Sequence, residues 1–564
     1  MIICGIKLTH DGALALIDNG KLIFSYEMEK IDNGERQSVF RLTIREVEEI
    51  LATHGYSLQE IDQIVIDGWD KPTIDILLDD KTEVKVKVAG YGHFVEKEED
   101  ILAAESFTIA EYGLPYKSYK HVSSHVIGAY CTSPFARDKE DCFCLVWDGG
   151  MPPQLFYYTY GENSWSNLGP LFLFGGFMYV DFAHAFEPFS RTETSLSLAG
   201  KVMAYIALGK TDEEVLRKYR EIFAQLNGMV ESDTVNIEIL RIMNAAFIEQ
   251  AVEFCSLHHI PHENMLTTFH VFLQELLVEN LARAIKNYPM CAKNLCFAGG
   301  SALNIKWNSA IREGGIFRDV WVPPFPNDSG SAIGTACCEM ILHEDCRSLQ
   351  WDVYSGPPVK NFRQEEKGYD VCPCEIKELA YLLYKYKKPV VFLNGLAELG
   401  PRSLGNRSIL SPAGEPTMKA VLNKIKGREY YRPVAPICLE EDAPKIFDPG
   451  SPDPYMLYEH TVRRDWKDKV PAICHLDGSA RLQTVNRTEN APVYELLTAY
   501  RDLSGIPLLC NTSANFHGKG FFPDVESVMQ WGNVDFIWND GRLFYKTGSF
   551  DAKELLRMSF AEVK

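Results

Sequence analysis

Residues 1–26 read MIICGIKLTHDGALALIDNGKLIFSY, and this stretch decides which class of fold is expected. Apolar residues dominate 2–6, 13–17 and 22–26, as in three short β-strands. The turn sequences Thr-His-Asp-Gly at 9–12 and Asp-Asn-Gly at 18–20 predict that these strands pair as hairpins. A capping box of Thr43 with Glu46 then begins a helix that Gly55 ends, so the chain opens as an α/β domain.

Two histidines, His121 and His125, are four residues apart, and on a helix both imidazoles could bind one cation. Asp148 and Asp328 each follow an apolar run, and α/β folds place ligands beyond the carboxyl ends of strands. Two His with two Asp suit Fe(II), Mn or Zn. Because the chain has 14 histidines, a surface or capping histidine at position 121 remains an alternative.

Composition narrows the class of protein. The 564 residues are enough for two or three domains, and the net charge of −20 disfavours a duplex nucleic acid as partner. We expect no membrane span, because no apolar run approaches about 18 residues. We also expect no signal peptide. The 15 cysteines are scattered without a zinc-spaced C-x-x-C pair, as in reduced cytoplasmic proteins.

Further along, the pattern predicts a helical middle over 211–286 and then a strand leading into Gly299-Gly300. Backbone amides at such a helix start can bind an anion or nucleotide, although a Gly-Gly pair is often a plain turn. Periodicity lapses over 348–374, which we interpret as a linker between domains of residues 1–347 and 375–564.

The segment from Arg402 to Arg432 departs from the acidic character of the chain, with seven basic residues against two acids. Several of these residues lie in Gly/Pro-punctuated loops. We therefore favour a focused phosphate-binding site over a solvated basic face.

Taken in order, these runs resemble the ATP-dependent O-carbamoyltransferases, typified by the enzymes that carbamoylate nodulation factors, cephamycins and tobramycin. The resemblance covers nearly the whole chain, and GPRSLGNRSIL at 400–410 is its most specific match. It implies an α/β protein with an actin-like ATPase domain, similar to threonylcarbamoyl synthases, followed by a YrdC-like domain. The second domain would make carbamoyl adenylate from carbamoyl phosphate and ATP, with Mg, and the first would transfer the carbamoyl group to an acceptor hydroxyl.

The residues that match the family's motifs fall into four sets. His10 or Asp11 is the candidate acceptor of the hydroxyl proton, and a divalent ion, Fe(II) before Mn or Zn, is expected on His121, His125, Asp148 and Asp328. The adenylate is expected at Gly149, Gly299, Gly300 and Asn304. ATP and carbamoyl phosphate are expected at Arg402, Ser403, Leu404, Gly405, Arg407, Arg428, Arg432, Arg481, Asn511, Ser513 and Asn515.

The sequence also departs from the family. The stretch Glu29–Arg36 leaves open which basic residue contacts nucleotide, and Lys519 stands where an acid is usual. We expect a cytoplasmic monomer or homodimer acting on a small natural product or sugar. One alternative is a hydroxymethylated pyrimidine nucleotide or nucleic acid as acceptor. The others are an actin-like small-molecule kinase and a non-catalytic metal-dependent binding protein.

Overall fold

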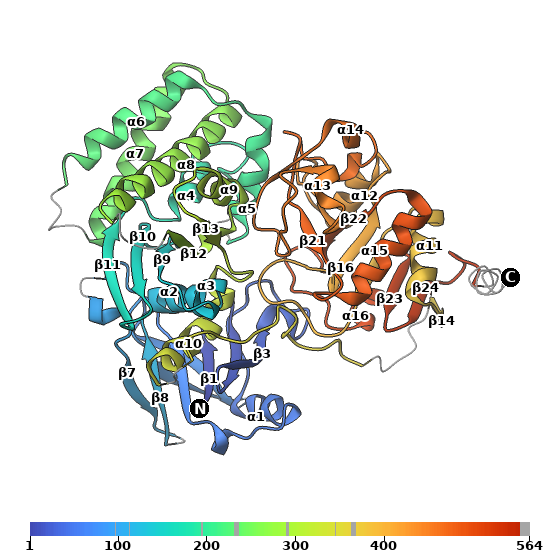
Figure 1. Cartoon of the computed structure of the whole chain (residues 1–564), viewed down its shortest axis with the longest axis horizontal. Coiled ribbons are helices and arrows are strands. Elements are labelled where there is room, and N and C mark those ends of the chain that lie inside the picture. Colours follow the sequence, from blue (N-terminus) through green and yellow to red (C-terminus); the bar gives the residue numbers. More distant parts are fainter. Residues whose placement is uncertain are drawn as a thin grey trace. The chain divides into compact units, whose positions relative to one another are not determined.

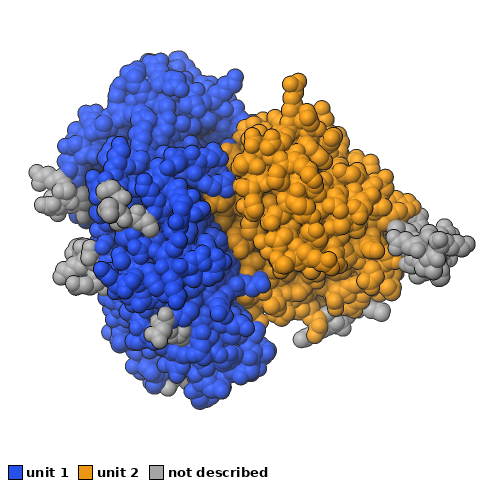
Figure 2. All heavy atoms as spheres, viewed as in Figure 1, with its two compact units in different colours: residues 1–25, 37–352 blue, residues 26–36, 353–564 orange. Residues whose placement is uncertain are grey.

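The computed structural model of this chain describes residues 1–79, 81–95, 98–111, 113–192, 196–230, 236–288, 293–343, 346–361 and 368–552. Two units can be distinguished, Met1–Ser25 with Gln37–Asp352 and Tyr26–Arg36 with Val353–Lys564 (Figure 2). The short segment 26–36 belongs to the second unit, where Phe521 N donates to Glu29 O at 2.8 Å and Gly520 N donates to Gly34 O at 2.7 Å. The domain limits that we drew at 347 and 375 stay a prediction, and residues 362–367 of the expected linker lie outside the described residues.

The predicted opening of the chain is confirmed. Strands β1 (Ile2–Lys7), β2 (Ala13–Asp18) and β3 (Lys21–Glu27) precede α1 (Ile44–Thr53), which carries the capping box of Thr43 and Glu46. With β4 (Gln63–Asp67), β7 (Glu105–Ile109) and β8 (Leu114–Tyr119) they form a sheet of order β3-β2-β1-β4-β8-β7. Strand β1 pairs with β2 antiparallel and with β4 parallel. A separate hairpin joins β5 (Thr73–Asp79) to β6 (Thr82–Lys87).

A second sheet repeats this topology. It contains β9 (Cys142–Val146), β10 (Gln154–Thr159), β11 (Ser164–Pro170), β12 (Asn294–Ala298) and β13 (Asp319–Trp321) in the order β11-β10-β9-β12-β13. Strand β9 is antiparallel to β10 and parallel to β12, as β1 is to β2 and β4. A duplicated sheet of this order is the architecture of actin-like ATPase domains, so the fold predicted for the first part of the chain is confirmed.

Two helices tie the sheets together. Helix α2 (His121–Cys131) follows the first sheet but packs on β9 and β12, whereas α10 (Ser331–His343) follows the second sheet but packs on β1, β2 and β4. They also pack on each other so closely that a Cβ on Gly334 would lie 2.0 Å from the Ser124 carbonyl oxygen. This contact requires glycine at position 334.

The remaining helices of the first unit lie mostly between β11 and β12. They are α4 (Met178–His184), α5 (Leu198–Tyr205), α6 (Glu213–Asn227), α7 (Ile237–Leu257) and α8 (His262–Lys286), and the last three run side by side (Figure 1). Helices α6 to α8 confirm the predicted helical middle. The shorter α3 (Pro134–Arg137) and α9 (Ile305–Glu313) follow α2 and β12. Within the described ranges, no helix has the length and apolar character to cross a bilayer.

The second unit is a mixed sheet of order β14-β24-β23-β15-β16-β22-β17-β21, which confirms the α/β class. Helices α11 (Ile376–Tyr386) and α15 (Ala491–Ser504) pack on one face, and α12 (Met418–Ile425) and α16 (Val525–Trp531) pack on the other. The strands are β14 (Tyr369–Pro373), β15 (Val390–Leu393), β16 (Arg407–Pro412), β17 (Ala435–Leu439), β21 (Gln483–Val485), β22 (Leu508–Ser513), β23 (Phe536–Asn539) and β24 (Arg542–Lys546). Between β17 and β21 lie α13 (Ala443–Ile446), α14 (Arg464–Lys467) and the small sheet of β18 (Phe447–Asp448), β19 (His460–Val462) and β20 (Ser479–Ala480).

Candidate functional site

Four predicted ligands meet at the start of helix α2. His121 and His125 lie on one face of this fully buried helix, and their Nε2 atoms are 3.2 Å apart. Asp148 follows β9, and Asp328 begins the short turn before α10. Asp328 Oδ1 is 3.4 Å from His121 Nε2 and 3.5 Å from His125 Nε2, and Asp148 Oδ2 is 3.9 Å from His121 Nε2.

All four donor atoms lie within 4.8 Å of one another. Two ligands that each sit about 2.0–2.2 Å from one ion are necessarily no more than about 4.4 Å apart, and these spacings are close to that limit or below it. We call this set, His121, His125, Asp148 and Asp328, the His/Asp group. Its chemistry of two imidazoles and two carboxylates fits a divalent ion such as Fe(II), Mn or Zn.

A second set of side chains orients these ligands. Asp67 Oδ2 lies 2.7 Å from His121 Nδ1, which leaves Nε2 to face the group. Lys7 Nζ lies 2.9 Å from Asp67 Oδ2 and 2.9 Å from Asp328 Oδ2, and the Tyr91 hydroxyl donates to Asp148 Oδ2 at 2.5 Å. Burial alone would raise the pKa of Asp328, but Lys7, His121 and His10 hold that pKa well below its ordinary value.

Lys7 and Asp67 were not predicted from the sequence as residues of this site. Each is a charged residue at the end of an apolar strand, β1 or β4, and both are buried. This is the pattern by which we selected Asp148, so the signal was present in the sequence.

His10 and Asp11 occupy the turn between β1 and β2, beside the His/Asp group. His10 Nδ1 is 3.0 Å from Asp11 Oδ2, and His10 Nε2 is 3.5 Å from Asp328 Oδ2. Burial would lower the pKa of His10, yet Asp328 and Asp11 raise it above the ordinary histidine value. With 29% of its side chain exposed, His10 is open to solvent on one side of the group, whereas the ligands are buried.

The glycine loops predicted for nucleotide lie next to the same group. Gly300 N donates to Asp148 Oδ1 at 2.6 Å, so this amide holds a ligand carboxylate. Gly299 has φ +89, and a Cβ there would lie 2.4 Å from the Trp147 carbonyl oxygen. Asn304 caps α9, and its side chain accepts from Lys306 N and Trp307 N. Gly149 O accepts from Phe177 N at 2.9 Å, so this glycine anchors the segment that leads into α4.

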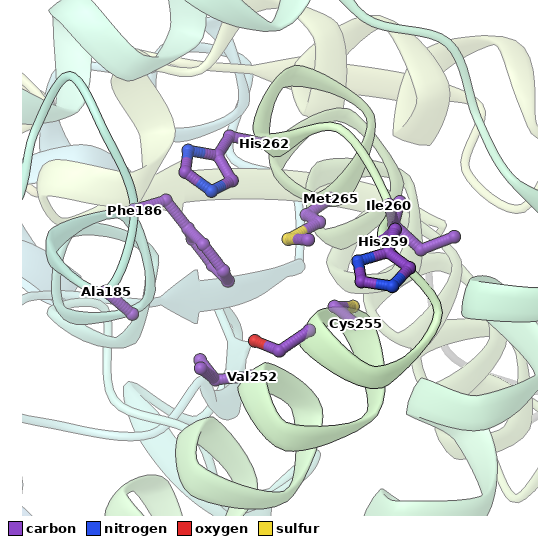
Figure 3. A pocket seen from close by; sticks show the side chains of 9 residues that line it. Ala185, Phe186, Val252, Cys255, His259, Ile260, His262 and Met265 are labelled. Carbon is purple, nitrogen blue, oxygen red and sulfur yellow. The ribbon is translucent and has the colours of Figure 1, made fainter.

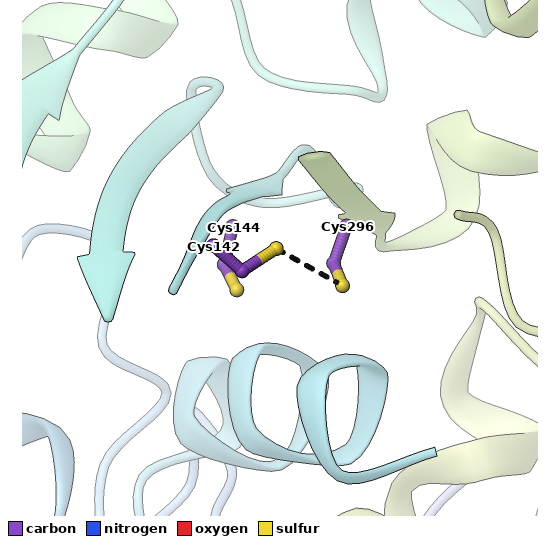
Figure 4. Close-up of side chains that lie close together, drawn as sticks. All are labelled: Cys142, Cys144 and Cys296. Atoms are coloured by element: carbon purple, nitrogen blue, oxygen red, sulfur yellow. Dashed lines mark hydrogen bonds between the residues drawn. The ribbon is translucent and has the colours of Figure 1, made fainter. Parts of the chain in front are cut away.

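Two further features of the first unit involve none of the predicted site residues. Cys142, Cys144 and Cys296 bring three buried thiols together on β9 and β12, with 3.5 Å between the Sγ atoms of Cys142 and Cys296 (Figure 4). Burial raises the pKa of Cys142 and Cys144 well above the ordinary thiol value, which favours their neutral form. We therefore interpret the cysteines as core packing. A pocket of about 370 Å³ also opens beside α7 and α8, lined by Phe186, Val252, Cys255, Ser256, His259, His262 and their neighbours (Figure 3).

Five arginines gather in the second unit, and we call Arg36, Arg402, Arg428, Arg432 and Arg481 the arginine group. Burial, and then the charges of Arg36, Arg432 and Arg428, lower the pKa of Arg402 to about 10. Burial and the other arginines also lower the pKa of Arg428, to about 9, and lower that of Arg481 strongly. Arg481 Nε is buried and has no hydrogen-bond partner among the described residues. A cluster of this kind can bind a dense anion, whose charge would offset the mutual repulsion.

Arg36 is the member that we did not predict. It lies in the Glu29–Arg36 stretch, where the departure from the family pattern left the nucleotide contact open. Its guanidinium donates to the Pro401 carbonyl at 3.0 Å, which brings it to the loop that carries Arg402.

Polar side chains on β22 and the loop after it join the two arginine-bearing loops. Asn511 donates to Ser403 O at 3.0 Å and to Gln483 Oε1 at 2.8 Å, and Arg428 Nη1 donates to Thr512 Oγ1 at 3.1 Å. Lys426, which was also missed, is buried and donates from Nζ to the carbonyls of Ser513 and Asn515 at 2.6 and 2.5 Å. Burial and then Arg428, Arg36 and Arg432 lower the pKa of Lys426 strongly.

Arg407, Leu404 and Gly405 differ from the other predicted contacts. The terminal nitrogens of Arg407 donate to four backbone carbonyls, those of Asn394, Asn406, Pro357 and Gly395, and the side chain is buried. Glu398 Oε1 accepts from the backbone N–H of Leu404 at 2.5 Å and from those of Asn406 and Arg407 at 3.2 Å. Gly405 has φ +118 in this turn, so these residues shape the loop around Ser403.

Comparison with known proteins shows which family the chain belongs to. The family models described as Carbamoyltransferase N-terminus and Carbamoyltransferase C-terminus match residues 2–337 and 382–538. Nodulation protein U of Rhizobium tropici is 47% identical over 97% of this chain and 96% of its own length. The 3'-hydroxymethylcephem-O-carbamoyltransferase of Streptomyces clavuligerus is 29% identical over 94% of this chain and 96% of its own.

Among solved structures, a putative N-acetylmannosamine kinase from Listeria monocytogenes aligns with 61% of this chain and 100% of its own at a TM-score of 0.27 and 14% identity. That likeness is too low to support an inference. The two family matches and the relatives that align over nearly the full length are decisive. The chain belongs to the carbamoyltransferase family and is an enzyme that transfers carbamoyl groups.

Proposed function

We propose that this enzyme is an O-carbamoyltransferase that forms carbamoyl adenylate in its second unit and uses it for transfer in its first. The arginine group carries the proposal. Five guanidinium groups that repel one another, in a chain of net charge −20, need an anion of high charge to neutralise them. A nucleoside triphosphate with carbamoyl phosphate supplies that charge, and guanidinium forks match phosphate oxygens in pairs.

In the activation step, water hydrolyses carbamoyl phosphate to carbamate and inorganic phosphate, and a carbamate oxygen attacks the α-phosphorus of ATP. Pyrophosphate leaves, and a mixed anhydride of carbamate and AMP remains. Arg402, Arg428, Arg432 and Arg481 would neutralise the charge that moves onto the leaving phosphates, with Mg on the ATP. Asn511, Ser513 and Asn515 would fix the loops that carry these arginines.

In the transfer step, the His/Asp group would hold a divalent ion, Fe(II) before Mn or Zn. When bound there, the ion would neutralise the adenylate phosphate as a Lewis acid. His10 would take the proton of the acceptor hydroxyl at Nε2, because Asp11 occupies Nδ1 and Nε2 faces Asp328. The hydroxyl oxygen then attacks the carbamoyl carbon, AMP leaves, and the product is an O-carbamoyl ester.

The acceptor is proposed to be a small-molecule hydroxyl, the class to which the 3'-hydroxymethylcephem named for a relative belongs. A hydroxymethylated pyrimidine nucleotide would require the same chemistry, and no feature of the described residues favours it. The kinase and binding-protein hypotheses would leave the arginine group without a role, and membership of the carbamoyltransferase family excludes both.

The experiment is release of pyrophosphate from ATP, followed with and without carbamoyl phosphate and then with a panel of hydroxyl acceptors that includes 3'-hydroxymethylcephem. Arg432→Ala should reduce the carbamoyl-phosphate-dependent release by about 10- to 100-fold, since a charge-assisted hydrogen bond contributes roughly 1.5–3 kcal/mol. Arg487→Ala, an exposed arginine paired with Glu495, is the matched control and should retain full release. Release that does not depend on carbamoyl phosphate would rule out the proposed activation step.

A further inference from the structure

Lys7 is a buried ammonium group placed between two carboxylates at the His/Asp group. It ends β1, its side chain is 1% exposed, and its Nζ lies 2.9 Å from both Asp67 Oδ2 and Asp328 Oδ2. A buried lysine that keeps its charge needs such partners, because burial by itself favours the neutral amine. The position is therefore built to hold a positive charge beside the ligands.

Lys7 and Asp67 decide which ligand atoms face the centre of the group. Lys7 engages Oδ2 of Asp328, so Oδ1 is the oxygen that faces His121 and His125. Asp67 engages Nδ1 of His121, so Nε2 is the nitrogen that faces the group. Side chains that orient metal ligands in this way commonly change metal affinity when they are replaced.

The summed charge of the His/Asp group with Asp67 and Lys7 suits an ion of defined valence. Asp67, Asp148 and Asp328 carry three negative charges, and Lys7 supplies one positive charge. The two ligand histidines are neutral when they bind a metal, and the Tyr91 hydroxyl donates to Asp148 as a neutral phenol. Two negative charges remain, and a divalent ion neutralises them. The His10–Asp11 pair lies alongside and is the same in every variant considered below.

We propose that the balance of charge between Lys7 and Asp67 fixes the net charge that the bound ion meets, so that the site prefers a divalent over a trivalent cation. This inference rests on the proposed metal-dependent function and adds a selectivity device to it. Lys7 repels a trivalent ion more strongly than a divalent ion, because the repulsion grows with the charge of the ion. Removing Lys7 should therefore favour trivalent over divalent ions, and removing the charge of Asp67 should do the opposite.

The test is a charge cycle with three variants of the full-length enzyme, Lys7→Met, Asp67→Asn and the double variant. Asparagine keeps an oxygen that can accept from His121 Nδ1, so Asp67→Asn changes charge with little change in geometry. The probes are Mn(II) and Ga(III), mixed in chelator-buffered equilibrium dialysis, with bound metal counted by mass spectrometry. Thermal unfolding checks that each variant is folded.

The ratio of bound Ga(III) to bound Mn(II) should rise on the order of 10- to 100-fold in Lys7→Met, as expected for one buried unit charge at a separation of several ångströms. It should fall in Asp67→Asn and return to within a few-fold of the starting value in the double variant. Enzyme loaded with Fe(II) should also convert to Fe(III) faster in Lys7→Met when exposed to air, as followed by electron paramagnetic resonance.

Each other outcome overturns a distinct statement. If the starting enzyme binds no more Mn(II) than His125→Ala, the proposed metal function fails. If metal binds but the ratio does not move in either single variant, the valence inference fails. If both single variants lose all metal and the double variant does not regain it, the pair is structural and does not select valence. If Lys7→Met does not fold, the lower ratio of bound Ga(III) to bound Mn(II) predicted for Asp67→Asn still tests the inference.

Discussion

Replacing Arg428 by methionine should make the unliganded enzyme more stable and the liganded enzyme less stable. Arg428 is half-buried among positive neighbours, and burial together with Arg432, Arg36 and Arg481 lowers its pKa to about 9. Because a guanidinium stays protonated near neutral pH, this unfavourable interaction persists as lost stability of the folded state. Methionine removes the charge and keeps much of the apolar stem.

The magnitude follows from the same shift. The fall in the pKa of Arg428 from the ordinary arginine value would correspond to roughly 5 kcal/mol if all of it acted on folding. Solvent screening of a partly exposed group reduces this to about 1–2 kcal/mol. The lost hydrogen bond to Thr512 Oγ1 offsets about 1 kcal/mol. A net gain of between zero and about 1 kcal/mol remains, which corresponds to a rise in Tm of up to about 4 °C for a unit of this size.

With pyrophosphate bound, the starting enzyme should be more stable than Arg428→Met. A ligand at 100 times its Kd stabilises the starting enzyme by about 2.7 kcal/mol, and the variant should bind it about 10- to 100-fold more weakly. The assay is scanning calorimetry with and without pyrophosphate, and Arg487→Met is the control for loss of an exposed charge. An Arg428→Met enzyme with a lower Tm without ligand, and the same pyrophosphate shift as the starting enzyme, would refute the reasoning about the arginine group.

Three further predictions address other parts of the chain. His125→Ala should abolish transfer to acceptor and binding of Mn(II) while carbamoyl-phosphate-dependent pyrophosphate release continues, as measured by separate assays of the two steps. Loss of both steps would contradict the proposal that the two units carry out separate steps. Burial raises the pKa of Glu27 to about 7, so the protonated form is favoured in the folded state and stability is lost as pH rises from about 4.5 to 7; urea unfolding of Glu27→Gln should lack this pH dependence, while the loss of the 2.9 Å ion pair with buried Lys30 should lower the stability of the variant at every pH. Gly334→Ala should cost more than about 2 kcal/mol, because the new Cβ would meet the Ser124 carbonyl oxygen, whereas Gly161→Ala, with open space around it, should cost less and keep Mn(II) binding.

Local signals in the sequence were sufficient for the elements at the start of the chain and for the His/Asp group. The strands and the capped helix α1 follow from period and capping chemistry, which act within a few residues. His121 and His125 were selected from their helical spacing together with the two aspartates further along the chain. Asp148 and Asp328 were selected because each follows an apolar run, and in the structure both lie beside the histidines of α2.

The partners that orient these groups were not predicted, because their role depends on tertiary proximity. Lys7 and Asp67 are far apart in sequence and become neighbours only through parallel pairing of β1 with β4. Arg36 has a similar origin, since it joins Arg402 across a separation of several hundred residues. Arg407 was predicted as a phosphate contact, and in the structure its guanidinium donates to buried carbonyls; composition does not distinguish these two roles.

The geometry of the His/Asp group depends on how closely two helices approach. His121 and His125 lie on α2, while Asp328 lies at the entry to α10, so the Nε2 to Oδ1 distances of 3.4 and 3.5 Å are set by the packing of these helices. That packing passes through Gly334 and the Ser124 carbonyl, one residue before His125. Any side chain at position 334 must therefore move the histidines relative to Asp328. The glycine thus helps to set the geometry of the His/Asp group although it lies outside it, and its replacement should weaken the proposed Mn(II) binding in proportion to the displacement of α2.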